Sequence, residues 1–226
     1  MSIHKFDHHI QAGIFAKLRA SSSLRYRDLK DPSLESSQFM YHLKELAKRD
    51  LVEKNENGHY KLTPKGISLA QYFSSEKAAL NPGTLSYTML FIRSKKGKWL
   101  LVKRKRQPFY GSYAAPSGKI HTHETLGQAV ERELALVTDG KIENKLQYKG
   151  YVSILTKNEF AETHVTGPIW FMDDCEEFDL SKITAKNLLW SDWKTLPYKD
   201  FIPGWREIVE MIEKGKPNYL DLEFDT

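Results

Sequence analysis

The sequence has little cysteine and no long apolar run. Its one cysteine, Cys175, cannot form an internal disulfide bond, which excludes a disulfide-stabilised scaffold and favours a reducing compartment. No segment approaches the ~18 consecutive apolar residues of a membrane span. The first residues, MSIHKFDHHIQAG, contain no apolar core of a secretion signal. We therefore expect a cytoplasmic protein with no membrane partner.

An acidic surplus is also missing, because the formal net charge is +5. Residues 1–75 hold twelve Lys/Arg and eight Asp/Glu, whereas residues 76–226 hold 22 and 21. The basic excess therefore belongs almost entirely to the first third, which also contains five of the eight histidines. This asymmetry predicts a polyanionic partner for the N-terminal part.

The hydrophobic pattern changes once along the chain. It is mostly helical up to Phe73 and alternates like strands from Leu85, while Ser74–Thr84 loses periodicity and contains the turn signal Asn-Pro-Gly. We therefore expect an α+β protein of two domains. The expected parts are a first domain at 1–73, a linker at 74–84, a second domain at 85–216 and a loose acidic tail at 217–226.

The first third predicts helices followed by a hairpin. Apolar residues at helical spacing, such as Phe39, Leu43 and Leu46, mark the helices, and Asn57-Gly58 marks the hairpin turn. Asp7 is a candidate N-cap for the first helix. The expected helices cover residues 7–19, 24–30, 35–49 and about 64–73, and the hairpin lies in residues 51–63.

This order of elements resembles a winged helix-turn-helix domain of the ArsR/MarR type, and SSQFMYHLKELAKRDLVEKNENGHYKLTPKG carries the resemblance. The resemblance implies binding to double-stranded DNA, with the third helix in the major groove and the hairpin on adjacent phosphates. Because one winged helix buries too little surface for tight specific binding, we expect a homodimer that reads two half-sites. The DNA-binding candidates are Ser37, Gln38, Tyr41 and His42 for bases, and Lys44, Lys48, Lys54, His59 and Lys61 for phosphates.

The C-terminal part predicts a sheet with two helices. Strands are expected at residues 84–92, 98–106, 146–155 and 164–172, and helices at about 125–137 and 203–214. Here the spacing of Gly118, Glu124 and the Arg132-Glu133 pair resembles the signature of the Nudix family. The resemblance implies a Nudix fold, a mixed sheet flanked by helices.

The same signature has lost acids. Leu136 and Val137 stand where the family carries a Glu-Glu pair, and that pair together with the residue at 133 forms its metal cluster. Nudix enzymes hydrolyse diphosphate linkages with Mg²⁺ or Mn²⁺, and such hard cations need several oxygen ligands. Glu133 alone remains as a catalytic or metal-binding candidate, whereas Glu124 and Arg132, which brace the loop in the family, are both kept.

We expect the pocket to retain ligand binding. The candidates for contacting a diphosphate are Arg104 and Arg106 in a basic run, together with Gly118 and Lys119. The basic run is equally typical of a solvated edge strand. His121 and His123 are typical of an exposed loop rather than of a metal site.

These patterns favour a DNA-binding transcriptional regulator whose catalytically silent Nudix-like domain binds a nucleotide-diphosphate-type effector. Two alternatives stay open. One is a divergent Mg²⁺-dependent hydrolase of nucleoside diphosphate derivatives with an accessory winged helix. The other is an interaction scaffold that uses neither DNA nor a ligand, since a charged helix face is often only a solvated face.

Overall fold

The structure is a computed structural model that describes residues 6–70, 72–74, 79–80, 83–140, 146–157, 162–183, 185–215 and 218–225. The described residues form two compact units. The first is centred on residues 6–83 and takes in 105–110, and the second contains 84–104, 111–157 and 163–225. No helix in these ranges is both long and apolar enough to cross a membrane.

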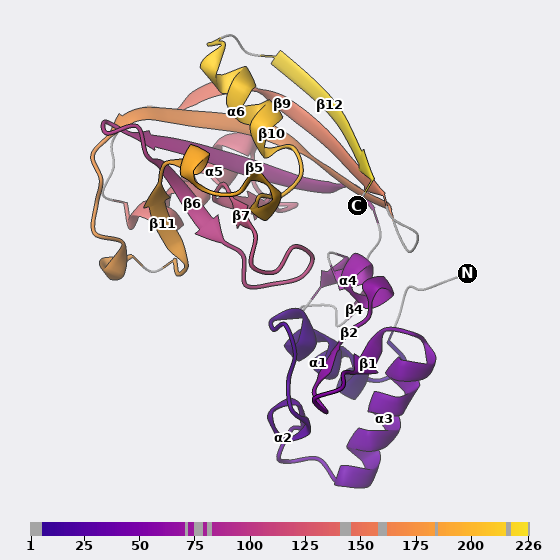
Figure 1. Cartoon of the computed structure of the whole chain (residues 1–226). Helices are drawn as coiled ribbons and strands as arrows, with labels where there is room; N and C mark the ends of the chain where they lie inside the picture. The colour runs from indigo at the N-terminus through magenta and orange to yellow at the C-terminus, as the bar shows by residue number, and fades with distance from the viewer. Residues whose placement is uncertain are drawn as a thin grey trace. The chain divides into compact units, whose positions relative to one another are not determined.

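The first unit has the element order of a winged helix (Figure 1). Its helices pack around one apolar core, in which Phe15, Leu18 and Leu46 are fully enclosed. An isolated antiparallel β-bridge pairs Leu24 with Tyr60, so Leu24 adds a one-residue third strand to the hairpin of the wing. The elements are α1 (His9–Arg19), α2 (Tyr26–Leu29), α3 (Ser36–Lys48), β1 (Val52–Lys54), β2 (Tyr60–Leu62) and α4 (Pro64–Ala70).

Two local features of this unit differ from what the sequence suggests. The N-cap of α1 is His8 rather than Asp7, because the His8 ring accepts the Ile10 N–H. The expected linker contains regular structure, since β3 (Phe73–Ser74) pairs antiparallel with β4 (Ala79–Leu80). The closing helix ends at Ala70, and the backbone from Phe73 is already extended.

The second unit is a mixed eight-stranded sheet with one long helix on each side (Figure 1). The path runs β11-β6-β5-β10-β9-β12, with β7 on β6 and β8 on β5. The strands are β5 (Leu85–Ser94), β6 (Trp99–Lys103), β7 (Tyr113–Ala114), β8 (Ser117–Lys119), β9 (Gln147–Lys157), β10 (Glu162–Cys175), β11 (Leu188–Ser191) and β12 (Asn218–Asp225). The helices are α5 (Leu126–Thr138) and α6 (Trp205–Glu213), with short 3₁₀ turns at Leu180–Lys182, Trp193–Thr195 and Tyr198–Asp200.

Alternation along β5 separates the two cores. Leu90 and Ile92 pack with α5, whereas Met89 and Phe91 pack with α6. Because successive side chains of a strand point to opposite faces, this strand forms part of both cores.

The expected loose tail is wrong, because residues 218–225 form β12, which pairs in parallel with β9 over all eight residues. Its sequence NYLDLEFD alternates apolar and polar residues, and Leu222 packs on the α6-side core while Asp221 is exposed. Burial of one face of the strand therefore outweighs the repulsion among its acidic side chains.

Candidate functional site

The residues of the degenerate signature meet where β8 leads into α5. A capping box fixes the start of the helix: Thr125 Oγ1 accepts the Gln128 N–H at 3.2 Å, and Gln128 Oε1 accepts the Thr125 N–H at 2.8 Å. This box satisfies two free N–H groups of the first turn. The helix then carries Arg132 and Glu133 back toward the strand.

Arg132 is the centre of the resulting network. Its guanidinium donates to both carboxylate oxygens of Glu124, at 2.9 and 2.6 Å, and to the Lys119 carbonyl at 2.9 Å. It also donates to Glu133. These bonds tie together the strand β8, the loop after it and the helix α5.

The electrostatics follow from these contacts. Hydrogen bonds from Arg132, and then from the His121 backbone N–H, lower the pKa of Glu124 to about 2. The same bond to Glu124 raises the pKa of Arg132. Glu124 is therefore a fixed anion at neutral pH, and it cannot serve as a proton donor.

Gly118 lies directly against Glu133. It pairs with Thr88 of β5, and a side chain at this position would overlap the carboxylate and the Cγ of Glu133. Glu133 itself is only 8% exposed. Nearby in the ladder, the buried Thr88 hydroxyl has no hydrogen-bond partner among the described residues. The site is therefore a close-packed junction between strand and helix.

Three positions carry metal-binding acids in the family. In this chain their side chains lie in three different environments. Glu133 is enclosed and paired with Arg132, Val137 is 5% exposed and packs in the α5-side core, and Leu136 is 45% exposed. Two of the three offer no donor atom, and the third is already bonded to a cation. Within the described parts of the chain, no group of three or more His, Cys, Asp or Glu is arranged to hold a metal. This donor set does not fit Mg²⁺ or Mn²⁺.

The four ligand candidates come from three segments of the chain. Gly118 and Lys119 belong to β8, beside Arg132. Arg104 follows β6 in the hairpin loop, where its backbone pairs with Ser112 and Gly111. Arg106 belongs to the first unit, and a pocket lined by both arginines stays a prediction. Strand β6 ends at Lys103, three residues before the expected end at residue 106.

The first unit presents a polar face on α3. Ser37, Gln38, Tyr41, Lys44 and Lys48 are all exposed, and Lys48 bonds Glu45 at 2.7 Å. On the wing, Lys54 lies over the Tyr60 ring and Lys61 pairs with Glu53 at 3.0 Å. His59 is half-buried at the turn end of the wing, where Arg25 donates to Nε2 and Ser23 contacts Nδ1.

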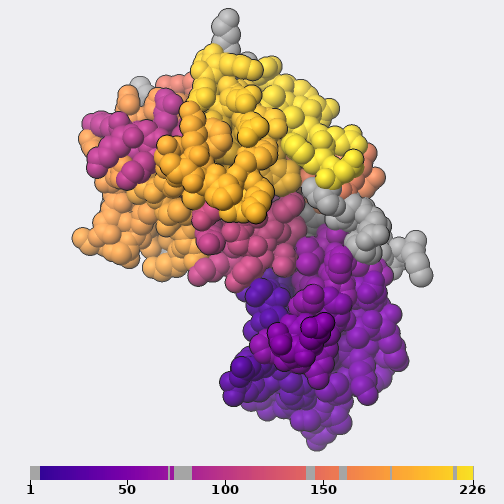
Figure 2. All heavy atoms as spheres, in the orientation of Figure 1, coloured from indigo at the N-terminus to yellow at the C-terminus, as the bar shows by residue number. Residues whose placement is uncertain are grey.

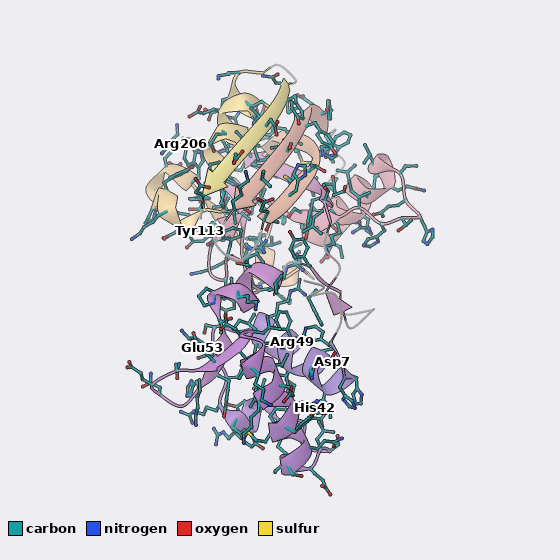
Figure 3. The ribbon with its side chains drawn as sticks, turned by 90° about the vertical axis from the view of Figure 1, so that its right-hand side faces the viewer. Asp7, His42, Arg49, Glu53, Tyr113 and Arg206 are labelled. Atoms are coloured by element: carbon teal, nitrogen blue, oxygen red, sulfur yellow. The ribbon has the colours of Figure 1, made fainter. Side chains whose placement is uncertain are left out.

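His42 does not belong to the exposed face, which corrects its assignment as a base reader. It is only 8% exposed and stacks on the His8 ring, with centroids 4.3 Å apart. Its Nδ1 is buried with no partner in the described structure, and burial, reinforced by His8 and His9, lowers its pKa. Figure 3 shows His42 near Asp7, whose carboxylate lies 3.5 Å from Arg49 of the same unit. The adjacent histidines after Asp7 were the only sequence signal for this cluster.

Comparisons with known proteins give one family match and several similar solved structures. The NUDIX domain family matches residues 84–146, and no curated protein matches the chain. Among solved structures, the NUDIX domain of Shewanella oneidensis NrtR complexed with ADP-ribose is similar over 58% of this chain and 86% of its own, at 18% identity and a TM-score of 0.44. A MutT protein from Methanosarcina mazei Go1 is similar over 60% and 97%, at 21% identity and a TM-score of 0.46. A NUDIX hydrolase from Nitrosomonas europaea is similar over 77% and 93%, at 15% identity and a TM-score of 0.43. The family match, together with the signature residues from Gly118 to Glu133, identifies a Nudix domain at residues 84–146 of this chain.

Proposed function

We propose that this protein is a cytoplasmic, homodimeric DNA-binding regulator whose Nudix domain binds a nucleotide-diphosphate-type effector without hydrolysing it. One observation carries the proposal: Glu133 is enclosed by Arg132 and Gly118, while Leu136 and Val137 replace the other acids. The junction keeps its architecture without the donor set for a catalytic dication. A receptor that does not cleave its signal is consistent with this loss.

The exposed face of α3 supports DNA as the partner of the first unit. Gln38 and Tyr41 offer hydrogen-bonding groups, and Lys44 adds a charge, on a helix of the diameter that a major groove admits. The wing adds Lys54 and Lys61 for phosphates. One winged helix buries too little surface for tight specific binding, so two copies on two half-sites are the natural arrangement.

A regulator of this kind requires coupling between its two units. The effector must bind one DNA-binding state more tightly than the other, with a coupling free energy of typically about 1–3 kcal/mol. Effector binding then changes the affinity for DNA by the factor that corresponds to this coupling free energy. DNA binding changes the affinity for the effector by the same factor.

DNA binding is tested with a double variant, Lys44→Ala/Lys48→Ala, in gel-shift assays at several salt concentrations. Loss of two phosphate contacts is expected to weaken binding to every sequence and to flatten the salt slope by roughly two units. The matched control is Lys199→Ala/Lys214→Ala, which removes the same charge from exposed positions of the second unit. Equal losses in both variants, or no DNA binding by the wild type, would contradict the proposal and leave the scaffold alternative.

Effector binding is tested by calorimetry with nucleoside diphosphate derivatives, including ADP-ribose, the ligand in the NrtR structure. Each compound is also incubated with the protein and Mg²⁺ or Mn²⁺. Binding without product is the expected result. Turnover that disappears in Glu133→Gln would establish the hydrolase alternative instead.

A further inference from the structure

A second candidate site lies on the α6 face of the C-terminal sheet. It is a cleft of two lobes, about 450 and 360 Å³, and Arg93, Asp173 and Glu213 line both. The larger lobe also borders the turn between β5 and β6. In Figure 2 this turn is the magenta patch at the left, flanked by orange atoms from later segments. Both volumes fall within the roughly 300–1,000 Å³ of small-molecule sites.

This cleft is separate from the Nudix junction. Gly118 pairs with Thr88 in the first half of β5, whereas Arg93 stands near the end of that strand. Thr88 and Arg93 are five residues apart, so their side chains point to opposite faces of the sheet. Arg93 lies on the same face of the sheet as Phe91 and α6, whereas α5 covers the opposite face.

Contacts with Asp173 and two aromatic rings fix the position of the Arg93 guanidinium. Its Nε and Nη2 donate to the two carboxylate oxygens of Asp173, at 2.8 and 2.6 Å. Its guanidinium lies 5.6 Å from the Trp99 ring centroid and 5.4 Å from that of Phe171. This pairing uses one edge of the guanidinium, and within the described residues the Nη1 edge has no acceptor. The side chain of Arg93 is 32% exposed, so solvent or a ligand can reach it.

The charge balance of the cleft selects the ligand class. Four basic and four acidic side chains line the larger lobe, and two of each line the smaller one. A polyanion such as a nucleotide diphosphate gains no net attraction from such a lining. A small molecule with one carboxylate and one ammonium group can use both signs: Arg93 can bind the carboxylate in a fixed, charge-assisted geometry, and Glu213 can accept from the ammonium group.

We propose that this cleft binds a free amino acid or a short peptide through its two charged termini. The partly exposed ring of Trp193 gives the apolar part of such a ligand a surface to pack on. The site does not depend on the Nudix junction, so the protein would respond to a zwitterion as well as to any ligand of the other face.

The test uses the full-length protein and measures binding by calorimetry and thermal shift. The probes are the free protein amino acids, one at a time, and triglycine, each compared with N-acetylated and C-terminally amidated forms. Binding of at least one unmodified probe is expected, with both blocked forms weaker. Glu213→Gln should weaken that probe about tenfold or more, because it removes a charged hydrogen-bond partner. Glu210→Gln, an exposed acid on the same helix that does not line the cleft, should leave affinity unchanged.

The competing outcomes are distinct. No binding by any unmodified probe would overturn the proposal, and so would equal binding of blocked and unmodified forms. Binding that Glu213→Gln and Glu210→Gln reduce equally would also contradict it, because both variants remove the same charge. Circular dichroism and urea unfolding of both variants establish that they remain folded. DNA and nucleotide binding measured in parallel report on the proposed function separately.

Discussion

Gly118 and Glu133 are so close that a β-carbon on the glycine would occupy the position of the carboxylate. Arg132 donates a hydrogen bond to that carboxylate. The glycine of the signature is therefore required here by the packing of strand against helix, independently of any metal. The retained part of the signature is a structural joint, and its residues should affect stability as well as binding.

Replacing Gly118 with alanine should force Glu133 out of its position and disturb its bond to Arg132. We expect a loss of about 1–3 kcal/mol in the free energy of unfolding, the usual cost of overpacking. Urea denaturation measures it. Gly127→Ala is the matched control, because its nearest contact is ordinary at 3.9 Å and it lies in α5. Alanine there should be neutral or stabilise by up to about 1 kcal/mol. Equal changes in the unfolding free energy for both substitutions would contradict this prediction, because they would mean that Glu133 can move away from the added methyl group at no cost.

The Glu124–Arg132 bond should give the protein a defined response to acid. The folded pKa of Glu124, about 2, lies below the ordinary value near 4.3. Its contribution to stability is thus complete above the ordinary pKa and is lost as the pH falls from there toward 2. Unfolding free energies of wild type and Glu124→Gln should differ at pH 7 and converge in that window.

A control variant separates this effect from general acid sensitivity. Glu131→Gln changes an exposed acid on α5 that lies outside the bracing network. Its stability should follow that of the wild type over the whole pH range. A difference between wild type and Glu124→Gln that stays constant down to pH 2.5 would show that Glu124 has an ordinary pKa.

His42 should make the first unit sensitive to mild acid. Burial, followed by the neighbouring His8 and His9, lowers its pKa below about 6.5, while Glu45 acts weakly in the opposite direction. For a base with a lowered pKa, stability is complete above the ordinary value and falls as the pH drops below it. His42→Phe should reduce the stability lost between pH 7 and 5, measured by thermal unfolding. His121→Phe, which changes an exposed loop histidine, should retain the full loss.

Local signals predicted most of the fold correctly. Helical periodicity around Leu43 predicts α3, Asn57-Gly58 predicts the wing, and alternation predicts β5 and β10. Such elements depend on residues that are neighbours in sequence. The spacing from Gly118 to Glu133 likewise indicated which residues would converge at the junction of β8 and α5.

The errors occur where distant segments decide the outcome. His42 falls on the boundary between the two faces of α3, and the start of α1 decides that it is buried. Arg106 lies beyond the end of β6, so alternation along that strand no longer predicts its direction. The acidic residues after Gly215 suggested a tail because the sequence does not show that β9 offers a free edge.

The last strand provides the sharpest test of that correction. Leu222 packs on the α6-side core, whereas its neighbour Asp221 is exposed on the opposite face of β12. Leu222→Ala should cost about 1–2 kcal/mol in urea unfolding, less than for a fully buried leucine because the side chain is half-buried. Asp221→Ala should change stability by no more than about 0.5 kcal/mol. If residues 218–225 were a loose tail, neither substitution would alter the unfolding midpoint, and this pair of neighbours therefore distinguishes a paired strand from a tail.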